Sequence, residues 1–192
     1  MNQSINARFS LAVMSSNYAE KILGALASVD TTSLQRTARD IFSSTYIGTP
    51  RHVLHAMKSL FIHVNDHDTH ITLEGTLSPA SSSFDTTAPQ ILAPLSEVKF
   101  NLYAKVTLYA EITTADTWDT YKALLEDLAK NEKIHLQTTH LTVELYGNVH
   151  QIFNLFNAVI ASPSVSSLAN YALQFTLSVN SPSMKKMEHL NE

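Results

Sequence analysis

The chain has 192 residues, of which 44% are hydrophobic, and its 13 Lys and Arg against 17 Asp and Glu give a formal net charge of -4. This length holds one medium or two small domains with a real hydrophobic core, and because neither sign of charge is clustered, we expect neither nucleic acid nor an anionic membrane as a partner. The chain has no cysteine, which excludes disulfides, thiolate nucleophiles and thiolate metal sites.

The first residues and the glycine content give further exclusions. The N-terminal segment lacks the basic start and apolar run of a secretory signal, and no apolar stretch reaches the ~20 residues that span a bilayer. We therefore expect a cytoplasmic protein without membrane insertion. The chain has four glycines and neither a G-x-G-x-x-G nor a G-x-x-x-x-G-K motif, which disfavours a nucleotide or diphosphate ligand.

In the first half of the chain, hydrophobic periodicity changes several times between the strand value and the helix value. In chain order it predicts a strand, a helix, a polar edge strand, a strand, a helix and a last strand, over residues 7–14, 18–29, around 34, 42–46, 50–64 and 71–77. Thr49 and Pro50 give the second helix an N-cap and a proline at its first position.

The second half repeats this order. A strand that ends at 110 and starts as early as 98 precedes a helix, two strands, a helix and a last strand, over residues 116–128, 134–136, 141–145, 149–160 and 173–177. Asn148 and Gln151 have the spacing of a capping box at the start of the last helix.

A fixed shift of 99 or 100 positions superposes landmarks of the two halves. Gly48 falls on Gly147, and the segment 76–78 falls on 176–178, each of which reads Thr-Leu-Ser. Between the halves, the Ser, Thr and Pro bias of residues 79–94 interrupts the periodic pattern and is typical of a linker.

Each half therefore predicts the order β-α-β-β-α-β, and the fold class is α+β, with two tandem ferredoxin-like repeats built on antiparallel sheets. Both helices of such a repeat cover one face of its sheet, so the other face needs a cover that stacking of the two repeats or of two chains would supply. The expected boundaries are a first repeat over 1–79, a linker over 80–96, a second repeat over 97–183 and a C-terminal tail over 184–192.

Short segments at matching places in both halves carry a family resemblance. The first repeat has Arg8-Phe9-Ser10-Leu11 with Met14, Asp40, Gly48, His52-Val53, Thr69-His70-Ile71 and Gly75-Thr76-Leu77-Ser78. The second has Thr107-Leu108-Tyr109, His140, Glu144-Leu145, Gly147, His150 and Leu177-Ser178, then Asn180-Ser181-Pro182-Ser183 as the most specific short piece. In these segments the chain resembles the YKOF family of thiamin/hydroxymethylpyrimidine-binding proteins, from about residue 7 to 183.

This resemblance implies a homodimeric binding protein without a cofactor or catalytic activity. It also implies a thiamin or pyrimidine site in each repeat and a role in salvage or uptake of the vitamin. The chain departs from the family pattern at three positions that bear on ligand specificity. Ile41 replaces a histidine after Asp40, and Ala12 and Ala110 stand where the family has tyrosine and proline.

An aminopyrimidine has an amine donor and ring acceptors, so its site requires a carboxylate or carbonyl beside a hydroxyl or amide. Glu144 lies between Val143 and Leu145 in a predicted strand and therefore points to the face opposite theirs, which is open to a ligand. An ordinary solvated carboxylate is the alternative. Asp40 precedes the corresponding strand of the first repeat, where it serves either the ligand or a turn.

Hydroxyl and aromatic side chains complete the candidate ligand-binding set. Ser10, Ser43 and Thr45 share a polar strand face. Tyr46 and Tyr109 either stack on a ligand ring or pack in the core. His140 lies four residues before Glu144, so both project from one strand face, as a ligand-binding pair or a proton-transfer pair.

No metal site or catalytic constellation is expected. The histidines His63, His67 and His70 are spaced like ligands, but they fall on a helix end, a loop and a strand, without a carboxylate in a defined place. The sequence has no G-x-S-x-G motif. The alternatives to a binding protein are an ACT-like module that senses a small molecule and a small ferredoxin-like oxygenase or isomerase.

Overall fold

The computed structural model of the chain describes residues 4–80, 92, 95, 97–110, 115–138 and 142–183. The first repeat consists of β1 (Ile5–Val13), α1 (Tyr18–Ser28), β2 (Arg36–Arg39), β3 (Ser44–Gly48), α2 (Pro50–Val64) and β4 (Ile71–Pro79). The second consists of β5 (Asn101–Ala110), α3 (Ala115–Asn131), β6 (His135–Thr138), β7 (Val143–Asn148), α4 (Val149–Ala161), α5 (Pro163–Ser166) and β8 (Tyr171–Val179). The duplicated β-α-β-β-α-β order is confirmed, and the short α5 is an addition that periodicity did not predict.

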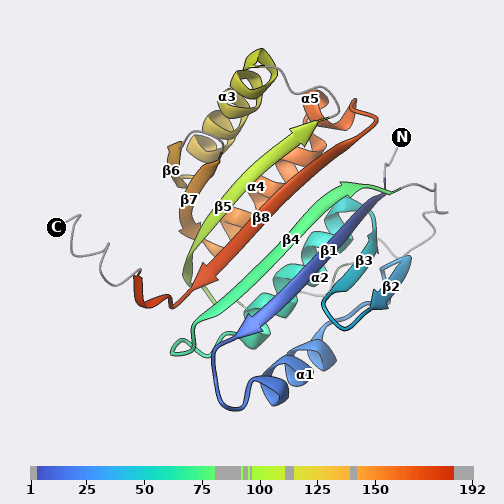
Figure 1. Cartoon of the computed structure of the whole chain (residues 1–192), viewed down its shortest axis with the longest axis vertical. Helices are drawn as coiled ribbons and strands as arrows, with labels where there is room; N and C mark the ends of the chain where they lie inside the picture. The colour runs from blue at the N-terminus through green and yellow to red at the C-terminus, as the bar shows by residue number, and fades with distance from the viewer. Residues whose placement is uncertain are drawn as a thin grey trace.

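The two repeats form one continuous antiparallel sheet of eight strands, in the order β2-β3-β1-β4-β8-β5-β7-β6 (Figure 1). They join edge to edge, because β4 and β8, the last strands of the two repeats, pair with each other. The sequence led us to expect that either the two repeats or two chains stack to cover the sheet. The two repeats do not stack on one another.

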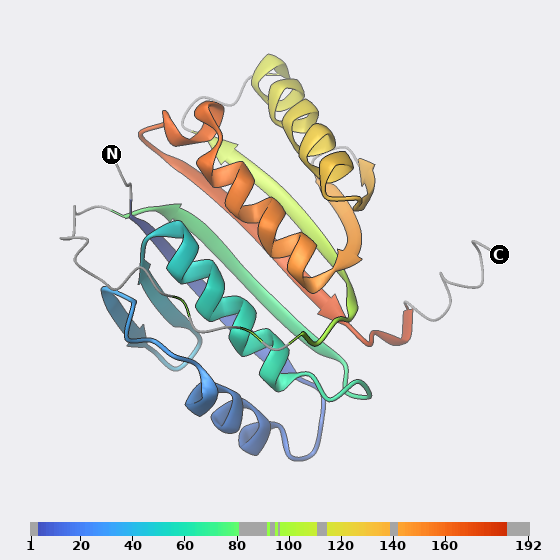
Figure 2. The same cartoon turned by 180° about the vertical axis from the view of Figure 1, so that it is seen from behind.

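All the long helices lie on one face of this sheet (Figure 2), and α2 and α4 pack together across the junction of the repeats. The core lies between the helices and the sheet, with Phe61, Leu73, Phe156 and Leu177 among its fully buried side chains. Side-chain caps fix where α2 and α4 begin: Thr49 accepts a hydrogen bond from the backbone of His52, and Asn148 forms the expected capping box with Gln151.

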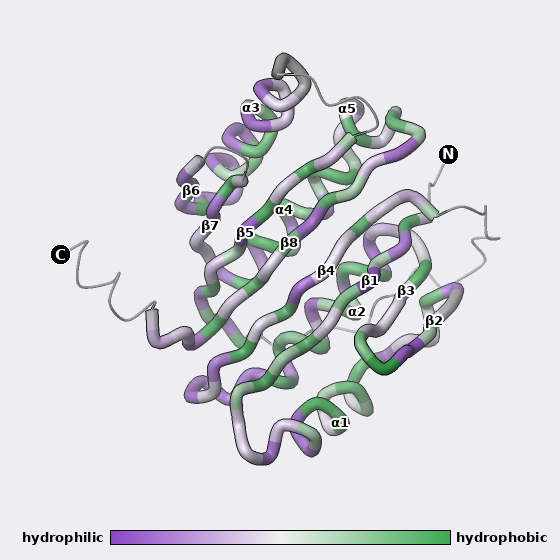
Figure 3. The backbone as a smooth tube through the Cα atoms, in the orientation of Figure 1, coloured by the Kyte–Doolittle hydropathy of each residue, from purple (hydrophilic) through white to green (hydrophobic). Residues whose placement is uncertain are grey.

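The opposite face of the sheet carries no helix of the described residues and is called the open face below. Strand side chains alternate between the two faces, so hydrophilic and hydrophobic positions alternate along the strands (Figure 3). In β8, for example, Leu173, Phe175 and Leu177 are buried under the helices, whereas Gln174 is exposed and Thr176 is half-buried on the open face.

At the centre of the junction, Gly75 of β4 pairs with Phe175 of β8. A Cβ atom at Gly75 would lie 2.7 Å from Phe175 Cζ and 2.7 Å from the backbone oxygen of Arg8. Glycine at this position therefore makes room for the Phe175 ring, which packs against Phe156 of α4 at a centroid distance of 5.5 Å.

Candidate functional site

A hollow of about 540 Å³ lies on the open face above β1, β4, β8 and β5. The turn between β2 and β3 forms one side of it. The residues that line it come from both repeats and are Arg8, Phe9, Ser10, Phe42, Ser43, Glu74, Gly75, Thr76, Lys105, Thr107, Tyr109, Thr142, Gln174, Phe175 and Thr176. Its volume is within the range of small-molecule sites.

Strand register places two rows of polar side chains beside each other on this face. One row crosses β3, β1, β4, β8 and β5 through Thr45, Arg8, Thr76, Gln174 and Thr107. The other crosses β1, β4, β8, β5 and β7 through Ser10, Glu74, Thr176, Lys105 and Glu144. A pseudo-twofold axis through the Gly75–Phe175 pair exchanges the two rows, so Arg8 corresponds to Lys105 and Glu74 corresponds to Gln174.

The turn beside the hollow is held by Asp40 and Arg8. Asp40 Oδ1 accepts hydrogen bonds from the backbone N–H groups of Phe42 and Ser43, both at 2.7 Å. These two bonds, with the Ser43 hydroxyl, lower the pKa of the Asp40 carboxyl. Arg8 Nε donates to Ser43 Oγ at 2.9 Å, and Arg8 Nη2 donates to Asp40 Oδ2 at 3.2 Å. The turn interpretation of Asp40 is therefore confirmed.

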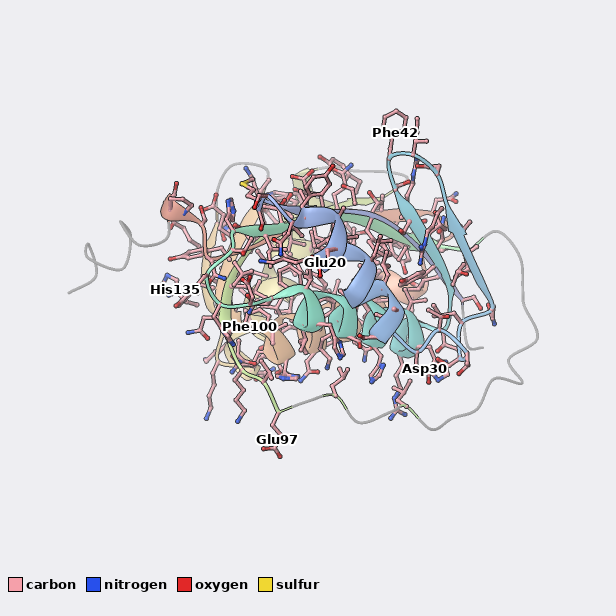
Figure 4. The ribbon with its side chains drawn as sticks, turned by 90° about the horizontal axis from the view of Figure 1, so that it is seen from below. Glu20, Asp30, Phe42, Glu97, Phe100 and His135 are labelled. Atoms are coloured by element: carbon pink, nitrogen blue, oxygen red, sulfur yellow. The ribbon has the colours of Figure 1, made fainter. Side chains whose placement is uncertain are left out.

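This turn positions an aromatic side chain at the hollow. Phe42 is 76% exposed and projects from the turn on the side of the sheet away from the helices (Figure 4). Tyr109 of β5, which is 49% exposed, lines the hollow from the second repeat. Exposed aromatic rings beside a polar floor suit a flat heteroaromatic ligand, because the rings stack on it while the floor forms hydrogen bonds.

The floor of the hollow combines hydroxyl, amide and charged groups. Glu74 is the only carboxylate among the described residues that line the hollow, and Arg8 and Lys105 are its cations. Arg8 is paired with Asp40, whereas Lys105 makes no ion pair with another described residue. The hollow therefore presents one carboxylate and one cation that are both available to a ligand.

The residues predicted from sequence fall into three groups. Ser10, Ser43 and Tyr109 line the hollow, and Asp40 holds the turn beside it. Thr45 and Glu144 lie on the same open face, at the outer ends of the two polar rows, and do not line the hollow.

The third group consists of Tyr46 and His140. Tyr46 is 2% exposed on the helix-covered face, where its ring packs edge-on against Phe9 at 4.9 Å and burial raises the pKa of its hydroxyl. Of the two roles expected for Tyr46, stacking on a ligand ring or packing in the core, the structure shows packing in the core. His140 lies outside the described residues.

Sequence reasoning did not select Arg8, Phe42, Lys105 or Thr107 as ligand-binding residues. The alignment of the two repeats indicated Glu74 and Gln174 as neighbours on the last strands, but neither was selected as a ligand-binding residue. The alternation that directed Glu144 to the open face applies equally to Glu74 and Gln174, since Glu74 follows the buried Leu73 and Gln174 lies between the buried Leu173 and Phe175. The pairing of β4 with β8 brings these two side chains together.

Within the described part of the chain, no three His, Asp or Glu side chains gather in a way that could hold a metal ion. The histidines with ligand-like spacing form other contacts: His70 Nε2 lies 3.0 Å from Ser178 Oγ, and His63 Nδ1 lies 2.8 Å from the backbone oxygen of Ser59. Across the same described residues, no helix has both the length and the apolar character needed to cross a membrane.

Comparison with known proteins gives one family match and one curated relative. The family model described as "YKOF-related Family" matches residues 4–83 and 101–184, one match for each repeat. A Bacillus subtilis (strain 168) protein named "Putative HMP/thiamine-binding protein YkoF" is 28% identical over 184 residues, which cover 93% of this chain and 91% of that protein.

Two solved structures also show a likeness. The regulatory subunit of aspartate kinase from Thermus flavus is 6% identical, with a TM-score of 0.24 over 83% of this chain and 92% of that one. The Clostridium acetobutylicum aspartate kinase is 6% identical, with a TM-score of 0.21 over 86% of this chain and 33% of that one. These scores are too low to support an argument about function.

Proposed function

The chain belongs to the YKOF-related family, and we propose that it is a cytoplasmic, non-enzymatic protein that binds thiamin or its hydroxymethylpyrimidine moiety in the hollow on the open face. The proposed role is salvage or uptake of the vitamin. The name of the Bacillus subtilis relative, which describes a binding protein for HMP or thiamine, supports the ligand class and the absence of catalysis.

The observation that carries this proposal is the composition of the hollow. Phe42 and Tyr109 provide aromatic surface for a pyrimidine or thiazolium ring. Glu74 accepts from an amine, and the amide of Gln174 and the hydroxyls of Ser10 and Thr107 donate to or accept from ring nitrogens. An aminopyrimidine needs this combination of groups.

We also propose that the protein is a homodimer in which a second copy covers the open face. The supporting observation is that both helix pairs lie on one side of an eight-stranded sheet, which leaves the other side to solvent (Figure 2). A second copy related by a twofold axis would present the same polar rows and aromatic side chains to the first. Light scattering at micromolar concentration checks this, and a monomeric mass would contradict it.

The test of ligand binding is calorimetric titration of the full chain with thiamin, hydroxymethylpyrimidine and thiamin diphosphate in parallel. We expect saturable binding of thiamin or the free pyrimidine. The diphosphate should bind less tightly, because the hollow has one unpaired cation among its described residues and no helix N-terminus among its lining elements. If neither thiamin nor hydroxymethylpyrimidine binds, the proposed function is wrong.

A pair of variants, each of which truncates an exposed apolar side chain, assigns the binding to the hollow. Phe42→Ala removes the stacking ring and should weaken binding about tenfold, since stacking on an aromatic side chain is worth about 1 to 3 kcal/mol. Leu23→Ala, at a residue of α1 that is 63% exposed and does not line the hollow, should leave the affinity unchanged. Equal effects of the two substitutions would place the ligand elsewhere.

A further inference from the structure

The helices α2 and α4 hold equivalent places in the two repeats, but they differ on the side that points away from the sheet. In α2, Val53 is fully buried and packs over Gly48 of β3. Ile62 follows Val53 by nine residues, which at about 100° per residue places it on the opposite side of the helix. Ile62 is nevertheless only 5% exposed, whereas Ala161, its equivalent in α4 by the shift of 99 positions, is exposed. An element that has no counterpart over α4 must therefore cover α2.

A second pair of equivalent residues shows the same difference. Lys58 of α2 is half-buried, whereas Asn157 of α4 is exposed. Lys58 forms no ion pair with another described residue, and its burial lowers the pKa of its ammonium group. The cover over α2 therefore removes part of the water around this side chain.

The connection that leads from the first repeat into β5 occurs once in the chain, and its described residues lie on the helix side of the sheet (Figure 2). Leu95 packs against the hydrophobic core, and the half-buried ring of Phe100 lies 6.0 Å from the ring of Phe61 of α2. Figure 4 shows Phe100 beside the helices and Glu97 pointing away from them. Leu95 and Phe100 therefore add apolar surface to the helix layer at α2.

The same connection is attached to the first turn of α4. The backbone oxygen of Phe100 accepts a hydrogen bond from the N–H of Val149 at 3.0 Å, and the backbone oxygen of Val98 accepts one from His150 Nε2 at 3.0 Å. Val149 is the first residue of α4, so its N–H has no partner within the helix. Both bonds use backbone oxygens of the connection, and they leave its side chains to contact α2.

We infer that Leu95, Val98 and Phe100 form a clasp that holds α2 of the first repeat against its sheet from an attachment on α4 of the second. Leu95 and Phe100 provide the apolar cover, and the backbone of Val98 provides an anchor. The connection between the repeats thus acts as part of the core of the first repeat, and this role does not depend on a ligand. Because the clasp occurs once, the two equivalent helices depend on it differently in local unfolding.

Amide hydrogen exchange of the full chain, followed by mass spectrometry, tests the clasp. In the double variant Leu95→Ala/Phe100→Ala, the amides of α2 should exchange at least about tenfold faster than in the wild type, because the helix loses buried contacts on its outer side. The amides in the C-terminal half of α4 should change less than about threefold. An equal rise in both helices would mean that the two residues contribute only to global stability, and it would overturn the inference. An unchanged α2 would overturn it as well.

A second measurement uses smaller changes and the equivalence of the repeats. Ile62→Asn places an amide under the clasp and should lower the folding equilibrium constant about tenfold or more. Ala161→Asn, the matched control in α4, makes the same change in helix propensity and should lower it less than about threefold. In the Phe100→Ala background the effect of Ile62→Asn should shrink to about threefold or less, since residues in contact are coupled. Equal effects of Ile62→Asn in both backgrounds would show that another part of the chain covers Ile62, and the clasp would be rejected.

Discussion

The two repeats share a scaffold but differ where side chains face solvent. Their strands follow the same order outward from the β4–β8 junction, and the Thr45–Arg8 pair of the first repeat corresponds to the Glu144–Lys105 pair of the second. Under the helices, both repeats bury aliphatic and aromatic residues. On the open face, the hydroxyl of Thr45 corresponds to the carboxylate of Glu144. On the covered face, close packing restricts which side chains can be substituted. On the open face, polar side chains can differ between the repeats and make different contacts.

The two repeats also differ at the axis itself, where Gly75 corresponds to Phe175. Two large side chains cannot occupy adjacent positions on the covered face there, because even a Cβ at Gly75 would lie within 2.8 Å of Phe175 Cζ, Phe9 Cβ and the backbone oxygen of Arg8. One repeat thus provides the space and the other provides the ring. Any restoration of symmetry at this pair should cost stability.

The largest expected effect is therefore that of Gly75→Ala, which should lower the free energy of unfolding by about 1 to 3 kcal/mol, the usual cost of overpacking. Urea denaturation measures it. Gly24→Ala is the control: Gly24 lies in α1 without a positive φ, and a Cβ atom there would meet no heavy atom within 4 Å, so alanine should stabilise the protein by about 0.4 to 1 kcal/mol. Equal stabilities for Gly75→Ala and the wild type would show that the junction relaxes freely.

The next effect sharpens the comparison between Thr45 and Glu144. If each repeat holds its own ligand, as the family resemblance implies, Glu144→Gln should weaken the second-repeat site about tenfold, because a charge-assisted hydrogen bond becomes a neutral one. Thr45→Val, which removes only a neutral bond, should have a smaller effect on the first. Calorimetry resolves the two steps, and a single step of one ligand per chain that neither variant changes would place the ligand only in the central hollow.

The smallest effect concerns the connections that lead into β4 and β8. In the first repeat, Asp66 binds Lys21 of α1 and accepts from the backbone and side chain of Thr69, and Lys21 is the largest cause of the lowered pKa of Asp66. The corresponding residues 162–170 contain no acidic side chain and include α5. Protonation of the Asp66 carboxylate at low pH should therefore lower the stability of the first repeat, and the corresponding connection of the second repeat has no such group.

The direction in which this stabilisation changes with pH follows from the lowered pKa of Asp66. The stabilisation is complete above the ordinary aspartate pKa of about 3.9 and is lost as the pH falls through the lower folded value. Because the Asp66 side chain is 39% exposed, Asp66→Asn should cost less than about 1 kcal/mol at pH 7, and the cost should shrink towards pH 2. Asp68→Asn, which removes the next carboxylate of the same loop and keeps the Lys21–Asp66 ion pair, is the control. A deficit of Asp66→Asn that is constant with pH would contradict the ion-pair explanation.

Local patterns in the sequence predicted the elements of the fold well. The 2-residue and 3.6-residue periods marked the strands and the four long helices, and the Asn148–Gln151 spacing predicted a cap that the structure contains. The shift of 99 positions that superposes Gly48 on Gly147 also equates Thr45 with Glu144, which agrees with the register of the two repeats. These features depend on residues close together in the chain, which is why they can be read from a single sequence.

The candidate site was less predictable, because it depends on how distant strands pair. Alternation shows that Tyr46 and Thr45 point to opposite faces, but which face the helices cover decides that Tyr46 is buried and Thr45 is open. The β4–β8 pairing uses backbone groups that have no side-chain signature. It brings Glu74 near Gln174, a proximity that depends on how the two repeats align and not on periodicity within either one.

The β4–β8 pairing also has a consequence for the order in which the chain becomes structured during synthesis. The first repeat is complete at Pro79, but β4 pairs with β1 on one side only. Its other side, which is one edge of the sheet, has no pairing strand until Tyr171–Val179 has left the ribosome, roughly 100 residues later. At about 5 to 20 residues per second, this nine-residue edge stays open for about 5 to 20 s. An unpaired strand edge is a template for intermolecular pairing. If translation stops in the second repeat before β8, the released chain therefore contains a folded first repeat whose β4 edge is unpaired and can pair with a strand of another molecule.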